Sequence, residues 1–395
     1  MRLLIDMMPL SAGGGVQVAV AFLEQLLRHA SAGSGQISWR ALAPQHLRAA
    51  LPANAAADTR VQYARKNSPY DLLLASRRLR TLERSFDADV VFTVFGPAYF
   101  KARAPHVVGF ALPNLIYRRD EAASPLISLK DSLKRALVRR ADHHVVETEL
   151  VRDRLSRCLG IDLQRISVIA NSINPLLGEY APVPPPIAGK FSILVPAAYY
   201  RHKNLEILPS VAAALGALQP HAAFEFLVTL DRSSREWEAI SHTARQMAVG
   251  DRIRTLGPLP LAMLAAAYQK ASVVLLPTLR EASTAVYPES FHFERPLITS
   301  DLDFARSLCG EAALYCDPID ASSFARALAL LIDDRATGAV RRALVENGRR
   351  RLATAYPSAE EKFVQQTALL QQFARERREI AAAPSLEGSQ CNPIS

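Results

Sequence analysis

An apolar run, Ala271–Leu276, leads into a short polar loop and then into a segment of helical character that carries two glutamates, Glu281 and Glu289. This order predicts a strand, a loop and a helix that opens near Pro288, because proline is tolerated in the first turn of a helix. In open α/β sheets, anionic ligands bind where the carboxyl end of a strand meets a helix N-terminus. The segment therefore predicts an α/β fold with phosphate at its amides and sugar or ribose hydroxyls at its carboxylates. Taken alone, two glutamates near a helix start are also common as partners of the helix dipole.

Apolar segments alternate with helical segments along the chain, which predicts parallel sheets. At 395 residues the chain is too long for one ordinary core, so we expect two domains of about 180 residues each. The proline-rich segment Tyr180–Lys190 is the clearest linker between them. Expected strands are Arg2–Asp6, Asp89–Val94, His106–Leu112, His143–Glu147, Ile166–Ala170, Phe191–Pro196, Phe224–Thr229, Arg252–Leu256 and Ala271–Leu276.

These boundaries predict an N-terminal Rossmann-like domain over residues 1–182 and a C-terminal one over residues 190–356. A long helical pattern follows over residues 357–380. The last stretch, residues 381–395, is small, polar and rich in proline and glycine, so we expect it to be disordered.

Three consecutive glycines, Gly13, Gly14 and Gly15, separate the first strand from a helical pattern over Val16–Ala30. Strand, glycine turn and helix together form an arrangement that suits phosphate. The segment lacks a complete GxGxxG fingerprint and its acidic partner, so we do not expect a nicotinamide site. Close approach of the backbone to a ligand explains three glycines better than local stability does.

Composition narrows the function classes. The four cysteines lie far apart without metal-type spacing, which predicts reduced thiols in the cytoplasm and no zinc site. No Asp-x-Asp follows a strand, so a metal-bridged ligand is not expected either. A formal net charge of +9 favours an anionic partner. Nucleic acid is not expected, because the basic residues are not interleaved with aromatic ones in a recognisable module.

The tightest basic cluster is Ser124–Arg140, which reads as an amphipathic helix. Two interpretations remain open: the helix lies on an anionic leaflet, or it is internal with a solvated basic face. The first would make the protein peripheral at the inner face of the cell membrane. The leucine stripe is Leu126, Leu129, Leu133 and Leu137, and the flanking cations are Lys130, Lys134 and Arg140.

Taken in order, these motifs resemble the large family of retaining glycosyltransferases of GT-B fold, called family four or group 1. Glu281 and Glu289 match the Glu-x7-Glu motif of that family, and Arg295–Asp301 match the strand that follows it. Residues 310–318 match the Gly-Glu-Ala-Ala strand and the Asp-Pro turn of the family. The likeness is strongest over residues 190–335. It implies two Rossmann-like parallel-sheet domains facing across a cleft, with the C-terminal helix crossing back to the first domain.

The resemblance also implies roles. Lys203 would direct its charge at the leaving diphosphate, Glu281 would contact hydroxyls of the donor sugar, and Glu289 would hold the ribose of the nucleotide. The glycine loop would touch acceptor or donor phosphate. The loop before the helix would supply hydroxyls from Ser283 and Thr284 and amides from Thr284, Ala285 and Val286.

The chain departs from the family pattern in two places. An arginine is common five residues before the lysine, but Ala198 stands there, and Arg201 or Arg280 could supply the second charge instead. A histidine is common at the end of a first-domain strand, but the matching strand ends in Ala111. His106 lies at the other end of that strand, and we expect it to be structural.

The function implied is retaining transfer of a sugar from a nucleotide-diphosphate sugar to a glycan or lipid-linked acceptor, without metal or cofactor, in polysaccharide or lipopolysaccharide biosynthesis. A nucleotide-sugar epimerase or a phosphorylase of the same fold would need further carboxylates and histidines, or a cofactor lysine, that the sequence does not display. A catalytically inactive binding or scaffold protein is the remaining alternative. The missing arginine and histidine favour it, and the intact Glu281, Glu289 and Lys203 weigh against it.

Overall fold

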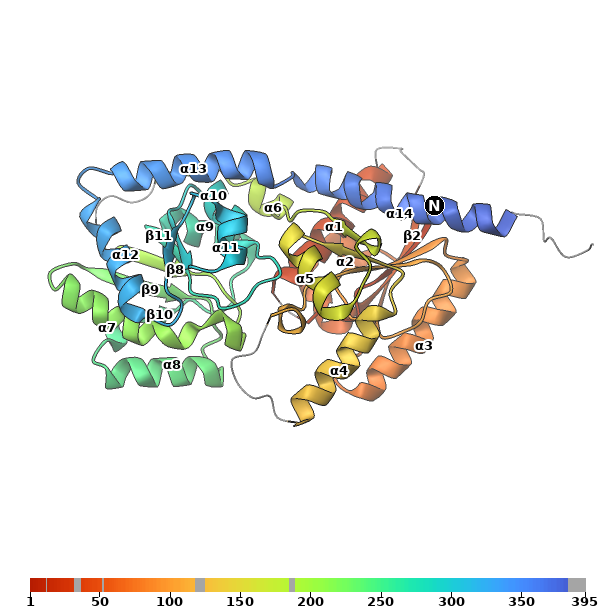
Figure 1. The fold of residues 1–395 in the computed structure, drawn as a ribbon, viewed down its shortest axis with the longest axis horizontal. Helices are drawn as coiled ribbons and strands as arrows, with labels where there is room; N and C mark the ends of the chain where they lie inside the picture. Colours follow the sequence, from red (N-terminus) through yellow and green to blue (C-terminus); the bar gives the residue numbers. More distant parts are fainter. Residues whose placement is uncertain (12, 32–36, 52, 118–124, 185–188, 383–395) are drawn as a thin grey trace, which may run out of the picture.

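The computed structural model describes residues 1–11, 13–31, 37–51, 53–117, 125–184 and 189–382, and in them the chain forms two parallel sheets flanked by helices (Figure 1). All strand pairs are parallel, as expected for this fold class. The first sheet has the order β3-β2-β1-β4-β5-β6-β7 and the second the order β10-β9-β8-β11-β12-β13. The predicted fold class is confirmed.

The first sheet consists of β1 (Arg2–Asp6), β2 (Ser38–Pro44), β3 (Val61–Ala64), β4 (Val90–Thr93), β5 (His106–Gly109), β6 (His143–Val146) and β7 (Ile166–Val168). The second consists of β8 (Phe191–Val195), β9 (Phe224–Val228), β10 (Ile253–Thr255), β11 (Val273–Leu276), β12 (Leu297–Ser300) and β13 (Leu314–Cys316).

The helices are α1 (Gly14–Ser31), α2 (Ala53–Ala57), α3 (Pro69–Phe86), α4 (Pro125–Arg139), α5 (Glu149–Leu159), α6 (Pro175–Gly178), α7 (Leu208–Leu218), α8 (Arg235–Gln246), α9 (Leu261–Lys270), α10 (Val286–His292), α11 (Asp303–Cys309), α12 (Ala321–Asp333), α13 (Ala339–Ala355) and α14 (Ala359–Ala382).

The expected strands are present, but the first sheet has two further strands and one strand is shorter than expected. Strands β2 and β3 are not among the expected ones, because β2 mixes exposed and buried residues without clean alternation and β3 has only four residues. The strand expected to reach Leu112 ends at Gly109. A Cβ on Gly109 would lie 1.9 Å from the Val94 carbonyl oxygen, so the last residue of this strand has to be a glycine.

Each face of the first sheet packs against its own set of helices, because successive strand residues point to opposite faces. Leu3, Ile5 and Phe92 form a core with α1 and α14. Leu4 and Val91 form a core with α3 on the opposite face. The second sheet is covered in the same way, with α7 and α12 in contact with each other on one side.

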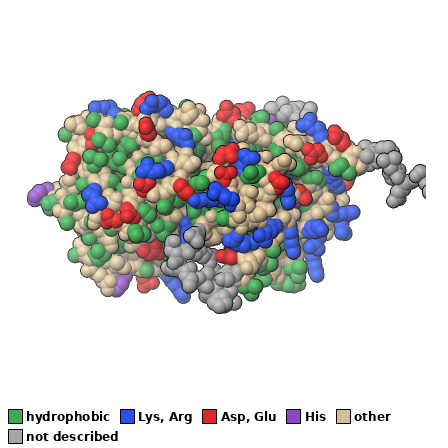
Figure 2. Space-filling view, in the orientation of Figure 1, with side chains coloured by type: hydrophobic (Ala, Val, Ile, Leu, Met, Phe, Trp, Pro, Cys, Tyr) green, Lys and Arg blue, Asp and Glu red, His purple; other side chains and the backbone are tan. Residues whose placement is uncertain are grey.

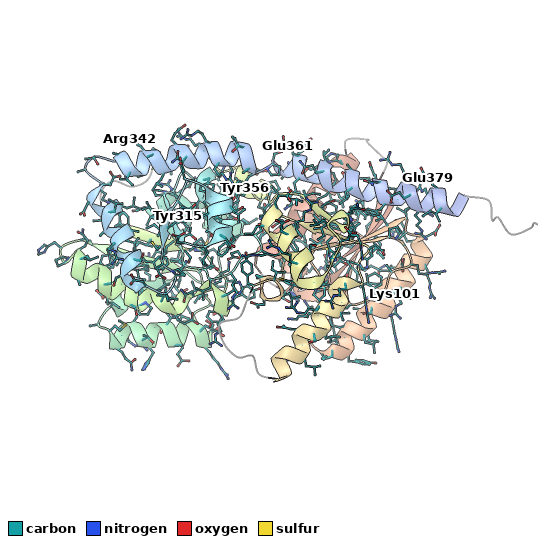
Figure 3. The ribbon with its side chains drawn as sticks, viewed as in Figure 1. Lys101, Tyr315, Arg342, Tyr356, Glu361 and Glu379 are labelled. Atoms are coloured by element: carbon teal, nitrogen blue, oxygen red, sulfur yellow. The ribbon has the colours of Figure 1, made fainter. Side chains whose placement is uncertain are left out.

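The last two helices connect the two halves of the molecule. In Figure 1, α13 runs beside the second sheet and α14 continues in nearly the same direction across the first. Figure 3 marks this path with Tyr356 at the junction and with Glu361 and Glu379 along α14. Phe363 of α14 is only 2% exposed and lies 5.4 Å, centroid to centroid, from the ring of Phe22. The expected crossing of the C-terminal helix is therefore confirmed.

The predicted linker begins as a segment held against the second half. The carbonyl oxygen of Tyr180 lies 2.9 Å from His292 Nε2, and that of Ala181 accepts from Gln269 Nε2 at 2.8 Å. Residues 185–188 of the predicted linker, and residues 383–395 of the predicted disordered tail, lie outside the described residues. The exact division of the chain into domains stays a prediction.

Replacing Phe363 by alanine should destabilise the protein by about 3–5 kcal/mol, because it opens a cavity where α14 meets α1. The neighbouring Val364 is 51% exposed, and Val364→Ala should change stability by no more than about 0.5 kcal/mol. Urea denaturation of both variants measures the difference. Equal effects would mean that α14 does not dock on the first sheet in solution.

Candidate active site

The loops after β1 and β8 meet where the two sheets face each other. Gly13 has a φ of +73°, a conformation that favours glycine. A Cβ built on Gly13 would lie 3.9 Å from Ala198 Cβ and 4.0 Å from a ring carbon of Tyr200. The glycine loop of the first half therefore lies directly against the loop that leads to Lys203 in the second half. Gly14 is exposed and begins α1, two residues before the expected start.

A lysine that the sequence analysis did not select supports this glycine loop. Lys66 Nζ donates to the carbonyl oxygens of Pro9 at 2.7 Å and Leu10 at 2.6 Å, and to Ser11 Oγ at 2.9 Å. Burial lowers the pKa of Lys66 to about 8, and the nearby charge of Asp6 opposes that shift. Lys66 thus holds the segment that precedes Gly13 in one conformation.

Lys203 and Glu281 form a nearly buried ion pair at the carboxyl edge of the second sheet. Lys203 Nζ donates to Glu281 Oε1, and their side chains are 12% and 6% exposed. Thr278 Oγ1 donates to the same carboxylate oxygen at 3.0 Å. The Leu279 amide donates to the His202 carbonyl oxygen at 2.7 Å, which ties the loop after β8 to the loop after β11. The two residues predicted to be catalytic therefore lie together.

Cationic side chains surround this pair. Burial, followed by the charges of Lys203 and Arg280, lowers the pKa of His202 to about 4, so His202 is neutral at physiological pH. Arg201 begins the same 3-10 turn, Arg201–Lys203, and is exposed. The Tyr200 ring stacks on His202 with centroids 5.5 Å apart. This edge of the second sheet thus carries Arg201, Lys203 and Arg280, and cations of this kind favour an anionic ligand.

Glu289 is a buried carboxylate on α10, 6% exposed. Burial raises its pKa to about 7, and the hydrogen bond from Tyr268 Oη to Glu289 Oε2, 2.7 Å long, opposes the shift. The helix begins at Val286, two residues before the predicted start, so Pro288 is its third residue and the carboxylate lies in its first turn. Glu289 is therefore fixed in position but holds a proton more tightly than an ordinary glutamate.

Glu289 lines a small cavity between the two halves. On one wall Asn174 Nδ2 donates to Gln17 Oε1 at 2.7 Å. On another, Lys362 Nζ of α14 donates to Glu147 Oε1 at 2.7 Å and to Asn171 Oδ1 at 2.9 Å. The lining mixes polar and apolar residues, and these are Gly14, Gln17, Val18, Ala21, Phe22, Gln25, residues 171–174, Ala285, Glu289, Ala359, Lys362, Phe363 and Gln366.

The loop between Glu281 and α10 is wedged between the two halves. Ala282 packs in a core with Phe110 and Leu115 of the first half. Ser283 Oγ is buried and has no hydrogen-bond partner among the described residues, and Thr284 Oγ1 accepts from the Val286 amide at 3.3 Å. A buried hydroxyl without a partner is costly, so Ser283 is suited to a ligand.

His106, the histidine expected to be structural, takes no part in this edge. His106 lies at the start of β5, with its Nε2 2.8 Å from Thr93 Oγ1, and burial lowers its pKa to about 3. Ala111 is exposed after the end of β5. Within the described ranges, no group of three or more His, Cys, Asp and Glu side chains is arranged to hold a metal ion. Metal independence stays a prediction.

Two family models match the chain. Residues 13–175 match the model described as Glycosyltransferase Family 4, and residues 190–334 match the one described as Glycosyl transferases group 1. No curated protein sequence matches the chain.

Solved structures share the two-sheet architecture. Anabaena HepE in complex with UDP and glucose is 13% identical, with a TM-score of 0.70 over 94% of this chain and 100% of that chain. Sucrose-phosphate synthase from Thermosynechococcus elongatus is 18% identical, with a TM-score of 0.70 over 97% and 99%. The lipopolysaccharide outer core galactosyltransferase WaaB is 14% identical, with a TM-score of 0.63 over 93% and 99%. At such identities the likeness establishes the fold.

Glu289→Gln should change how stability depends on pH. Between pH values of about 4.5 and about 7, the unfolded wild type ionises Glu289 while the folded protein keeps it protonated, so the wild-type free energy of unfolding falls as pH rises. Glutamine does not ionise in this pH range. The free energy of unfolding of the variant, relative to that of the wild type, should therefore rise by up to about 3 kcal/mol across this window. Urea denaturation over a pH series measures it, and a constant difference would show that Glu289 has an ordinary pKa.

Proposed function

Since the chain belongs to the group 1 glycosyltransferases of family 4 and is a nucleotide-sugar-dependent enzyme, we propose that it transfers a sugar, with retention, to a glycan or lipid-linked acceptor. We place this reaction in polysaccharide or lipopolysaccharide biosynthesis, at the cytoplasmic face of the cell membrane. The likeness in fold between this chain and a lipopolysaccharide galactosyltransferase supports that pathway. The described cysteines, Cys158, Cys309 and Cys316, are free thiols, which supports a reducing compartment.

The observation that carries the proposed site is the Lys203–Glu281 pair, placed opposite the glycine loop. In the proposed complex, the diphosphate of the donor lies between these loops. Lys203 keeps two further N–H donors for it after binding Glu281. Arg280, whose charge reaches His202, is the better candidate for the second cation than the more exposed Arg201. These charges would stabilise the negative charge that grows on the leaving diphosphate.

The two glutamates would orient the donor. Glu281, fixed by Lys203 and Thr278, would accept hydrogen bonds from hydroxyls of the sugar. Glu289, at the cavity between the halves, would accept from both ribose hydroxyls, for which a carboxylate is the strongest acceptor. Ser283 Oγ would gain its missing partner from the same ligand.

The backbone of both halves would contact the transferred group. Amides of Thr284, Ala285 and Val286 would approach the diphosphate or the sugar from the second half. Gly13, Gly14 and Gly15 would approach from the first, where a side chain on Gly13 would meet Ala198 and Tyr200.

We propose a front-face displacement for the chemical step. The bond between the anomeric carbon and the diphosphate oxygen breaks while the acceptor oxygen bonds to the same face of that carbon. The leaving diphosphate receives the proton that the acceptor hydroxyl loses, so no side-chain base is required. This fits the position of His106, which is neutral and lies at the opposite end of β5 from the site edge.

Lys203→Met should lower turnover of the donor by about hundredfold or more, as expected when a preorganised charge is removed from a growing anion. Lys270→Met, at the exposed end of α9, is the matched control and should keep wild-type turnover. Initial rates of nucleotide release from UDP-, GDP- and dTDP-sugars, measured well below the melting temperature of each variant, provide the comparison. Wild-type turnover by the Lys203 variant would refute the assigned role.

Chelation separates this mechanism from a metal-bridged one. If the cations of Lys203 and Arg280 replace a metal, excess EDTA should leave the initial rate unchanged, and added Mg²⁺ or Mn²⁺ should not raise it. A rate that EDTA abolishes and a divalent ion restores would contradict the proposed electrostatics.

A further inference from the structure

Helices α3 and α4 lie on the same face of the first sheet. The strand pairing places Leu4, Val91 and Val146 on one side of that sheet. Leu79 of α3 packs with Leu4 and Val91, and Val138 of α4 packs with Val146. Both helices therefore cover this face, and their outer sides belong to one side of the molecule (Figure 1).

The outer sides of these helices expose large apolar side chains. On α3, Tyr70 is 65% exposed, Leu73 48% and Leu74 42%; on α4, Leu129 is 67% exposed and Leu133 60%. They follow helical spacing, so on each helix they form a stripe. The leucine stripe predicted for α4 reaches the surface at Leu129 and Leu133 but not at Leu137, which is buried. The Leu126 side chain lies outside the described residues. We call these five exposed side chains the apolar stripes.

Basic side chains accompany the apolar stripes. Every charged residue of these two helices that is classed as exposed is a lysine or an arginine. Of the acidic residues described there, Glu83 is buried, and Asp71 and Asp131 are half-buried. Figure 2 shows blue side chains gathered over this part of the molecule. The exposed cations are Arg77, Arg78, Arg80 and Arg84 on α3 and Lys130, Lys134 and Arg139 on α4.

The apolar stripe of α3 lies toward the active-site edge of the sheet. In a parallel βα unit the helix starts where the strand ends, so the first turns of α3 and α4 lie at the carboxyl edge. Tyr70, Leu73 and Leu74 occupy the first two turns of α3. Lys66, which holds the glycine loop, lies just before that helix. A surface that contacted the apolar stripes would therefore lie beside the mouth of the cleft.

We propose that the outer sides of α3 and α4 dock on a membrane leaflet that contains anionic phospholipid, and that the acceptor is lipid-borne. Apolar side chains ringed by cations match the two layers of such a surface: acyl chains at the apolar stripes and phosphate headgroups at the basic residues. Within the described ranges, no helix has the length and apolarity needed to cross a membrane, so docking would be peripheral. The acceptor class rests on the proposed transferase function, whereas the docking itself does not.

The same cations would attract nucleic acid, but the leucines argue against it. A nucleic-acid surface pairs its cations with polar groups or stacking aromatic rings. Here four of the five apolar side chains are leucines with no ring to stack on bases. Burial in acyl chains gives these leucines a partner that a nucleic acid does not offer.

Vesicle flotation tests the proposal with the full chain. Wild type should float with vesicles of equimolar phosphatidylcholine and phosphatidylglycerol, and float poorly with phosphatidylcholine alone. Leu73→Ser combined with Leu74→Ser, and separately Arg77→Glu combined with Arg80→Glu, should each lower binding by about tenfold or more, since one basic residue near an anionic leaflet contributes roughly fivefold. Free inorganic phosphate should not compete, because the leaflet and not a single phosphate is recognised.

Matched controls come from the second half. Leu330→Ser on α12 removes an equally exposed leucine, and Arg235→Glu on α8 reverses an exposed arginine. Both should float as wild type does. Circular dichroism should show the same melting temperature for all variants, which excludes unfolding as the cause of lost flotation.

Several results would overturn the proposal. These are equal flotation with neutral and anionic vesicles, unchanged flotation of the α3 variants, or binding of a single-stranded oligonucleotide that exceeds vesicle binding and is lost in the arginine variant. Nucleotide release from a donor sugar in the absence of vesicles separates the two ideas. Flotation without any turnover would refute the transferase site alone, and turnover without flotation would refute the docking alone.

Discussion

The ion pair between Lys203 and Glu281 is the interaction on which the site depends. It joins two loops that are 78 residues apart in the chain, and Thr278 adds a hydrogen bond to the same carboxylate. Both charges are almost buried, so removing either would leave the other uncompensated in a place of low dielectric. The loop fixed in this way then leads through Ser283 into the helix that carries Glu289. The pair therefore fixes the start of the segment that carries Ser283, Thr284 and Glu289.

A second set of polar contacts shapes the first half beside that pair. Lys66 donates to the segment before the glycine loop, which lies against the loop after β8, and Lys362 of α14 donates to Glu147 and Asn171 beside the cavity. Because α14 follows α13, which packs against α10 and α11, the same helix pair crosses the molecule, and α14 supplies one wall of the cavity that Glu289 lines. Structure and site are thus built from the same contacts.

The sequence predicted local features well and distant partners poorly. Strand β11 is a continuous apolar run and β8 is apolar except for Ser192, so both can be recognised without any tertiary contact. Glu281 and Glu289 were found because they follow such a run. Lys66 lies 57 residues from its partner Pro9, and no local pattern marks it.

For the same reason, the sequence could not show which leucines of α3 and α4 are exposed. A leucine at helical spacing reads alike whether it faces a core or solvent, and only packing separates Leu137, which is buried, from Leu133, which is exposed. For α3 the periodic pattern contains leucines on both sides of the helix, so its exposed stripe could not be recognised from the chain alone. Nor could the sequence show that Lys203 and Glu281 share one ion pair.

Calorimetric titration of UDP, GDP and dTDP into wild type and Glu289→Ala tests the central assignment most directly. The account predicts that one nucleotide binds the wild type and that the variant loses about 1–3 kcal/mol of binding free energy. Equal binding to both proteins would contradict it.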